Sequence, residues 1–347
     1  MSTIHFLNVG EGDCTLIQHG FETKATGRLT TLIDICNGHY VPPDESEKDV
    51  VEQVLDEMFA NQEAAKGNFR MADKPTNPIE YLAKVGVRSL FRFILTHPDM
   101  DHLDGFDGLM GALSVGNFWD SGVRRDKPSF EGGPYNEADW DRYEKVCAGR
   151  EKSTNVMSVR AGSKFKFANR GEDDKAGGCC LEILAPDMGL IDAADDEASV
   201  NDASLMLLYR SPGGKILIPG DAHDDTWAHV LEQHTEAIRN CAVLLAPHHG
   251  RRSEANFDFL DTVNPRLTLF GCASSEHLAY DEWYRRDLPI ITNNQAGNII
   301  LECEKEQIDV YVQNAKFAKA QGADLSKTNS FGDTYLHSLV KAVQAAT

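Results

Sequence analysis

Residues 96–102 read Thr-His-Pro-Asp-Met-Asp-His and directly follow the apolar run 91–95. Four side chains that can bind a metal ion fall within the last six of these positions: His97, Asp99, Asp101 and His102. A strand end followed by a tight loop would direct them into one pocket. Imidazole nitrogens and carboxylate oxygens suit zinc, manganese or iron. The alternative is that these side chains only cap the helix that follows.

Two further apolar runs end in residues that would complete such a pocket. The run 216–218 is followed by Pro-Gly and then Asp221, and the run 244–246 by Pro and then His248 and His249. Taken alone, a strand-end aspartate is more often a helix cap than a ligand. Three groups with complementary ligands instead predict a centre for one or two divalent metal ions, zinc or manganese, with Asp221 between them. Two such ions would generate a hydroxide near neutral pH.

Short apolar runs alternate with helical stretches along the rest of the chain. The runs predict strands at 3–9, 13–18, 29–35, 91–95, 181–185, 203–210, 214–219, 241–246, 266–270, 289–292, 298–303 and 307–312. Helical spacing predicts helices at 46–66, 77–85, 103–113, 223–236 and 331–345. Two groups of strands with helices in both halves indicate an α/β domain in which two sheets pack together and helices lie outside.

Residues 118–180 interrupt this regular pattern. They contain a polar helix near 136–151 and a charged, glycine-rich segment at 169–178. Such a stretch is typical of a surface insertion, here a candidate lid. We therefore predict one hydrolase domain over 1–327, with 118–180 inserted, and a C-terminal helix in 328–347 that packs on it.

The composition indicates a globular protein with an acidic surface. Of 347 residues, 41% are hydrophobic and 25% charged, and the net charge is −20. An excess of acidic residues argues against broad, unassisted binding to a nucleic-acid backbone, although bound metal ions can reverse the local potential. No apolar run is long enough to span a bilayer, and the first residues lack a basic signal-peptide start. We expect a cytoplasmic protein with no membrane contact and with its eight cysteines reduced.

The metal-ligand motifs resemble those of the metallo-β-lactamase superfamily. The His-x-Asp-x-Asp-His run at 97–102, the strand that leads to Gly-Asp221 and the Pro-His-His-Gly at 247–250 carry this resemblance. The opening at 6–13, Phe-Leu-Asn-Val-Gly-Glu-Gly-Asp, and the Asn-Asp-Ala-Ser-Leu at 201–205 are similar to the ComEC-type competence hydrolase domain. The resemblance spans roughly residues 3–303 without 118–180. It implies an αββα four-layer sandwich with the metals at one edge of its sheets.

The resemblance also assigns roles to individual residues. It implies that His97 and Asp99 hold one ion, that Asp101, His102 and His248 hold the other, and that Asp221 bridges them. Asp34 matches an aspartate that orients a ligand. The sequence departs from the commoner pattern, because Asp99 stands where a histidine is usual. Before Asp221 there is no histidine to complete the first site, and the matching region offers Asn201 and Asp202. An oxygen-rich set would shift preference from zinc toward manganese or magnesium.

Other polar residues are candidates for the border of the centre. Asp13 is either a hairpin residue or a neighbour of the site, and His249 either contacts substrate or pairs with a ligand. Ser253 either donates to a phosphate oxygen, with Arg251 and Arg252 supplying charge, or caps the next helix. His277 matches a late histidine that would protonate a leaving group.

These features predict a metal-dependent hydrolase, with a phosphodiester as the leading substrate: a nuclease or a nucleotide phosphodiesterase acting on nucleic acid or a nucleotide. Asp101 and His277 are its predicted catalytic residues. One alternative keeps the metals and acts on a lactone, ester, thioester or β-lactam. Another is a catalytically weak interaction module of a multiprotein bacterial system, with a protein partner or a second copy of the chain. The missing third ligand and the 118–180 stretch motivate that last reading.

Overall fold

The computed structural model describes residues 1–23, 27–43, 50–171, 173–197, 199–252, 256–273 and 277–341. Two sheets form the centre of the molecule. The larger has nine strands in the order β15 (Thr334–Val340), β14 (Gln307–Val312), β13 (Ile299–Glu304), β1 (Ser2–Phe6), β2 (Thr15–Thr23), β3 (Gly27–Ile33), β4 (Ser89–Ile94), β5 (Ser114–Asp120) and β6 (Asn155–Ser158). The smaller has six, in the order β12 (Ile290–Thr292), β11 (Thr268–Phe270), β10 (Val243–Leu245), β9 (Gly214–Ile218), β8 (Met206–Ser211) and β7 (Leu181–Ala185).

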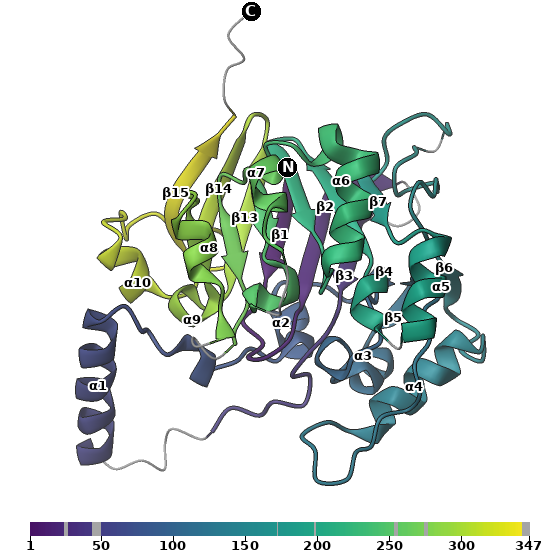
Figure 1. Cartoon of the computed structure of the whole chain (residues 1–347). Coiled ribbons are helices and arrows are strands. Elements are labelled where there is room, and N and C mark those ends of the chain that lie inside the picture. Colours follow the sequence, from purple (N-terminus) through teal and green to yellow (C-terminus); the bar gives the residue numbers. More distant parts are fainter. Residues whose placement is uncertain are drawn as a thin grey trace, which may run out of the picture.

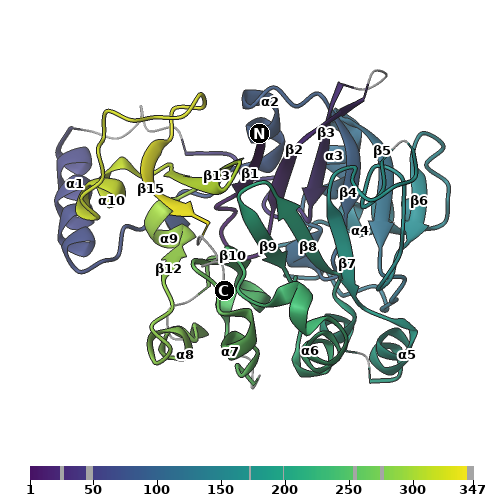
Figure 2. The same cartoon turned by 90° about the horizontal axis from the view of Figure 1, so that it is seen from above.

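Helices cover the outer face of each sheet, which makes four layers (Figures 1 and 2). The larger sheet is covered by α2 (Pro78–Lys84), α3 (Phe106–Ala112) and α4 (Glu137–Cys147). The smaller sheet is covered by α6 (Asp224–Ile238), α7 (Phe259–Val263) and α8 (Tyr280–Tyr284). The remaining helices are α1 (Val50–Ala65), α5 (Met188–Glu197), α9 (Asn293–Ala296) and α10 (Ala315–Ala320). The predicted αββα sandwich is therefore confirmed.

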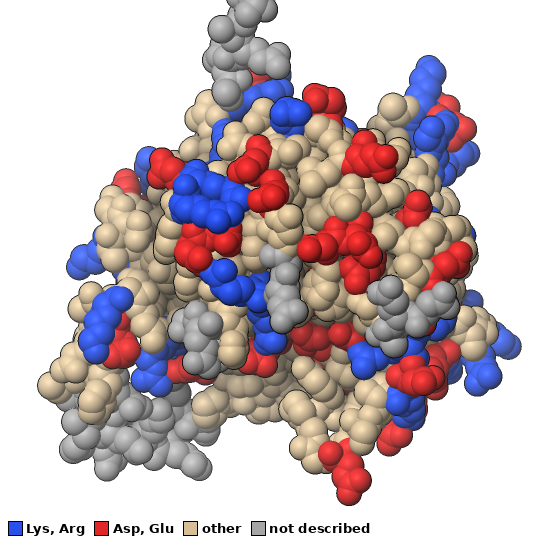
Figure 3. Space-filling view, viewed as in Figure 1, with Lys and Arg blue, Asp and Glu red and all other residues tan. Residues whose placement is uncertain are grey.

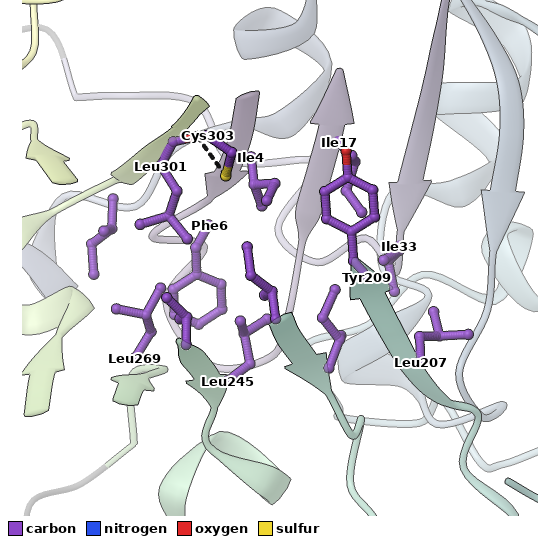
Figure 4. Close-up of a cluster of buried hydrophobic side chains, with 14 of the residues drawn as sticks. Ile4, Phe6, Ile17, Ile33, Leu207, Tyr209, Leu245, Leu269, Leu301 and Cys303 are labelled. Atoms are coloured by element: carbon purple, nitrogen blue, oxygen red, sulfur yellow. Dashed lines mark hydrogen bonds between the residues drawn. The ribbon is translucent and has the colours of Figure 1, made fainter. Parts of the chain in front are cut away.

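Alternation of apolar side chains along the strands explains the layering. Neighbouring residues of a strand point to opposite faces, so a strand buried on both sides carries two apolar rows. In β3, Ile33 lies in the core between the sheets and Leu32 packs under the outer helices. In β10, Leu245 faces the central core and Leu244 the helices of its own side. Figure 4 shows side chains of both sheets meeting in this central core.

The prediction of a C-terminal helix at 331–345 is wrong over 334–340. These residues form β15, which pairs antiparallel with β14 from Gln307↔Val340 to Val312↔Thr334. The pairing satisfies backbone groups of β14 that would otherwise lie at the sheet edge. Leu336 and Leu339, spaced like neighbours on a helix face, instead pack against the central core. The sheet therefore extends beyond the predicted boundary at residue 327.

The prediction that 118–180 is a surface insertion is also wrong for much of this stretch. β5 ends within it, and β6 adds a parallel strand beside β5. The helix predicted near 136–151 is α4, whose Trp140, Tyr143 and Val146 are buried against the larger sheet. Charged residues between these three positions obscure the apolar face of α4 in the sequence. Only the connections on either side of α4 and β6 lie outside the sheet and its covering helix.

Two surface properties match the composition. On the face drawn in Figure 3, basic side chains of the described residues are interspersed with acidic ones. Among the described residues, no helix is long and apolar enough to cross a membrane.

Candidate metal centre

The predicted ligands follow the carboxyl ends of parallel strands from both sheets. β3 runs parallel to β4, and β9 runs parallel to β10. Asp34 directly follows β3, and the 96–102 motif begins two residues after β4. In the smaller sheet, Asp221 comes three residues after β9, and His248 comes three residues after β10. Packing of the two sheets therefore brings these loops together at one edge.

Asp34 holds both the start of the motif and one of its histidines. Its Oδ1 accepts the backbone N–H of Thr96 at 2.8 Å, and its Oδ2 accepts the Thr96 hydroxyl at 2.7 Å. The same Oδ2 accepts Nδ1–H of His102 at 2.9 Å. Donation from Nδ1 leaves the lone pair on Nε2 of His102, which is the atom that faces the centre.

The opening loop of the chain lies against the 3₁₀ turn Met100–His102. The backbone N–H of Asp13 donates to the carbonyl oxygen of Asp101 at 3.3 Å. Gly12 has φ +106°, and a Cβ there would overlap that same carbonyl oxygen, so this close approach requires glycine. Asp13 Oδ1 lies 3.2 Å from Nδ1 of His249. The loop thus places Asp13 beside the centre rather than in a free hairpin turn.

Asp221 lies in the middle of the cluster, with its side chain 3% exposed. Its Oδ1 lies 3.2 Å from Nε2 of His102. Its Oδ2 lies 3.5 Å from Nε2 of His249, 3.7 Å from Nε2 of His248 and 3.9 Å from Nε2 of His97. The two oxygens of this carboxylate therefore lie near histidines from two other loops, 96–102 and 247–250, a position from which a carboxylate can bridge two ions.

One group of ligands contains Asp101, His102 and His249 around Asp221. Nε2 of His249 lies 3.2 Å from Oδ2 of Asp101. Ligand atoms of Asp13, His102, Asp221 and His249 all lie within 4.8 Å of one another, so this group could hold a metal ion. The geometry favours His249 for this group, where the resemblance implied His248.

A second group lies on the other side of Asp221. Nε2 of His97 is 3.7 Å from Oδ2 of Asp99, and His248 contacts the same Asp221 oxygen as His97. His223, the residue before α6, has its Nε2 3.1 Å from Nδ1 of His248. Sequence reasoning missed His223 because it sought a third ligand before Asp221, whereas His223 comes two residues after Asp221 and lies beside His248.

The buried polar atoms of the cluster fit a metal ion. Nε2 of His97, Nε2 of His102 and Oδ1 of Asp221 are buried without a hydrogen-bond partner among the described residues. An unpaired buried polar atom costs free energy unless a ligand satisfies it. Neutral imidazoles and carboxylates are ligands for zinc and manganese. The residues present therefore suit one or two divalent ions.

The electrostatics of the cluster keep its carboxylates ionised. Burial alone would raise the pKa of Asp221, but the protonated imidazoles of His249 and His102 hold it well below its usual value, and Asp221 in turn raises the pKa of both imidazoles. A bound metal ion would take the place of these imidazole protons. Burial lowers the pKa of His97 to about 4 and that of His248 to about 4, so both imidazoles are neutral near pH 7. Neutral imidazole is the form that binds metal.

The structure places the other predicted residues less centrally. The Asp202 carboxylate accepts the Ser199 hydroxyl at 2.6 Å, and its neighbour Asn201 has Nδ2 3.5 Å from Nε2 of His223. His277 is exposed, and its carbonyl oxygen accepts the backbone N–H of Arg252 at 2.7 Å. Ser253 lies outside the described residues. The roles given to Asp202, His277 and Ser253 stay predictions.

Comparison with known proteins finds distant relatives. No protein-family model matches the chain. Over 228 residues it is 21% identical to ComE operon protein 3 of Bacillus subtilis (strain 168), a match that covers 64% of this chain and 26% of that protein. The chain thus spans well under two thirds of this relative.

Solved structures give a second set of similarities. A diphosphatase from the PhnP family has 13% identity and a TM-score of 0.43, with 88% of this chain and 99% of that chain covered. Tm1679, a metal-dependent hydrolase of the β-lactamase superfamily, has 14% identity and a TM-score of 0.43, with 84% and 96% covered. The motifs at 97–102 and 247–250 predicted this kind of relative.

Proposed function

We propose that this chain is a metal-dependent hydrolase of phosphate esters, with a phosphodiester as its substrate. The observation that carries the proposal is the position of Asp221, whose Oδ1 faces His102 and whose Oδ2 lies among His97, His248 and His249. Such a carboxylate can be shared by two ions. Bound there, divalent ions would lower the pKa of a coordinated water and polarise a phosphoryl oxygen.

Two carboxylates of the chain, Asp34 and Asp13, orient two of the imidazoles toward the centre. Asp34 holds the Nδ1 proton of His102, and Asp13 lies at Nδ1 of His249, so each imidazole directs Nε2 inward. Asp99 and Asp101 are the more open members, with side chains 27% and 26% exposed. Substrate would therefore approach from the side of these two carboxylates. In this proposal His277 donates the proton to the leaving group.

His223 weakens the case for a catalytically weak interaction module. That alternative rested in part on a first site with too few histidine ligands. With His223 beside His248, the region of the first site contains three imidazoles and Asp99. This number of candidate ligands is enough to bind a metal ion, which a degenerate metal site would not be expected to retain.

Hydrolysis of bis-p-nitrophenyl phosphate tests the proposal. Purified protein loaded with Mn²⁺ or Zn²⁺ should release p-nitrophenol, and Asp101→Ala should abolish the release. Asp141→Ala is a matched control, because Asp141 is an exposed carboxylate that contacts Lys127 away from the ligands. Unchanged activity in Asp101→Ala would refute the proposal. Hydrolysis of nitrocefin or an acyl-homoserine lactone without phosphodiester cleavage would assign the centre to carbonyl substrates instead.

A further inference from the structure

The segment 121–136, between β5 and α4, reaches the metal-ligand cluster. It lies at the lower edge of the molecule in Figure 1, near α3. Arg125 of this segment forms an ion pair with Asp99 through Nη1 and Oδ1. Tyr135, near its other end, packs on the apolar cluster beneath the outer helices and lies close enough to Asp101 to feel its charge. The two ends of the segment thus lie along the 96–102 motif.

Arg125 differs from the other cations of its segment in the partner it contacts. Arg124 pairs with Asp120 at 2.8 Å, and Lys127 pairs with Asp141 at 2.6 Å and with Glu137 at 2.7 Å. These partners belong to β5 and α4, the elements that flank the segment. Arg125 instead contacts a carboxylate of the predicted metal centre, so its position serves the centre rather than the anchoring of the segment.

The contact leaves most of the guanidinium available to another ligand. Asp99 uses Oδ1 for Arg125, and its Oδ2 lies on the side of His97, 3.7 Å from Nε2. The Arg125 side chain is 37% exposed, and Asp99 is among the more open members of the cluster. A guanidinium has five N–H donors in a planar fork that matches the oxygens of a phosphate. A single carboxylate oxygen satisfies only part of that fork.

The negative charge of the centre explains why a nearby cation would help to bind an anionic substrate. Four carboxylates border it: Asp13, Asp99, Asp101 and Asp221. Two divalent ions would only neutralise them, and a single ion would leave the centre negative. An anionic substrate would then gain little net attraction from the metal centre of a chain whose overall charge is −20. Arg125 supplies the additional positive charge at the open side of the centre.

We propose that Arg125 binds the anionic phosphoryl group of the substrate and that Asp99 holds its guanidinium in place. This inference rests on the proposed function and names the residue that makes the centre selective for a phosphate ester over an uncharged ester. It also gives a reason for an aspartate at position 99. A histidine there could bind a metal ion but could not pair with a cation.

Binding of inorganic phosphate tests the inference separately from catalysis. Titration calorimetry of the Mn²⁺-loaded full chain gives the phosphate Kd for wild type, Arg125→Gln, Arg125→Lys and Lys127→Gln, while mass spectrometry gives the bound manganese. Loss of a charge-assisted hydrogen bond should weaken phosphate binding by about 10-fold or more in Arg125→Gln. Arg125→Lys should lie in between, because it keeps the charge without the fork. Lys127→Gln loses the same charge from the same segment and should bind like wild type.

Three results would overturn the inference. They are wild-type Kd in Arg125→Gln, no phosphate binding by the loaded wild type, and loss of manganese in Arg125→Gln, which would mean that Arg125 serves only the ligand Asp99. Failure of the proposed function has a different signature, since wild type would then bind phosphate without cleaving bis-p-nitrophenyl phosphate.

Discussion

Replacement of Asp34 by asparagine tests whether Asp34 orients His102, a predicted metal ligand. In the wild type, Asp34 Oδ2 accepts Nδ1–H of His102, and both oxygens also accept groups of Thr96. Asparagine can still accept from Thr96 through its single oxygen, but it presents an NH₂ group to Nδ1. His102 would then place its proton on Nε2, the atom that faces Asp221. The substitution therefore changes the ligand's tautomer while keeping the side-chain shape.

The expected loss concerns metal affinity. Removal of a partner that orients a metal-bound histidine lowers affinity by about 10- to 100-fold, which is about 1.4 to 2.7 kcal/mol. Some stability should be lost too, because a buried hydrogen bond to a charged group contributes about 1.5 to 3 kcal/mol. The two effects must be measured separately.

Competition with a chromophoric chelator measures the metal Kd at a temperature at which circular dichroism shows each variant folded. Asp120→Asn is the matched control. Asp120 is also buried at the end of a strand of the same sheet, and it accepts the Ser158 hydroxyl at 2.8 Å and pairs with Arg124 at 2.8 Å. We expect this variant to lose stability and keep wild-type metal affinity. Wild-type affinity in Asp34→Asn, or equal losses in both variants, would mean that Asp34 does not orient His102 for metal binding.

Two further predictions follow from the cluster and from the core. His249→Ala should lower the affinity for the tightest-bound ion by at least about tenfold, and by more than His248→Ala does, because His249 is fully buried and lies within 3.5 Å of both Asp101 and Asp221. A larger loss in His248→Ala, measured by chelator competition, would instead support the assignment of His248 that the resemblance implied. Unfolding in urea with a chelator present should show stability falling as the pH drops from 6.5 toward 4, since burial lowers the pKa of His5 to about 4 and the folded chain then binds fewer protons than the unfolded chain. The stability gap between wild type and His5→Asn should shrink by about 3 kcal/mol over this range, and a constant gap would contradict the burial of a neutral imidazole.

The layered fold was predictable because its strands carry continuous apolar runs. β7 and β14 have the bounds expected from the sequence, and both lie within the two sheets. β15 was mistaken for a helix because its leucines are three residues apart and because its strand character depends on pairing with β14. α4 was mistaken for part of an insertion because its apolar face is narrow. In both cases the residue spacing alone is ambiguous, and contacts with the rest of the sheet determine whether the segment is a strand or a packed helix.

The sequence predicted which loops form the candidate centre, but not which way each side chain in them points. Strand ends indicated which segments meet, and Asp34 lies beside His102 as an orienting residue would. His248 and His249 are adjacent and chemically identical, and both have positive φ, at 49° and 57°. Their directions therefore depend on how the loop packs, which no spacing rule contains. Arg125 was missed since its link to Asp99 crosses 26 residues and belongs to a segment without regular structure.

Anomalous scattering from crystals of the manganese-loaded protein would show directly whether the cluster around Asp221 holds a metal ion, with data collected on both sides of the manganese absorption edge. We expect a difference peak about 2.0–2.2 Å from Nε2 of His102 and from a carboxylate oxygen of Asp221, the usual metal–ligand distance. A second peak on the side of His97 and His248 would indicate a two-ion centre. Data that show no manganese between His102 and Asp221, in protein that remains folded, would mean that this cluster is not a metal centre.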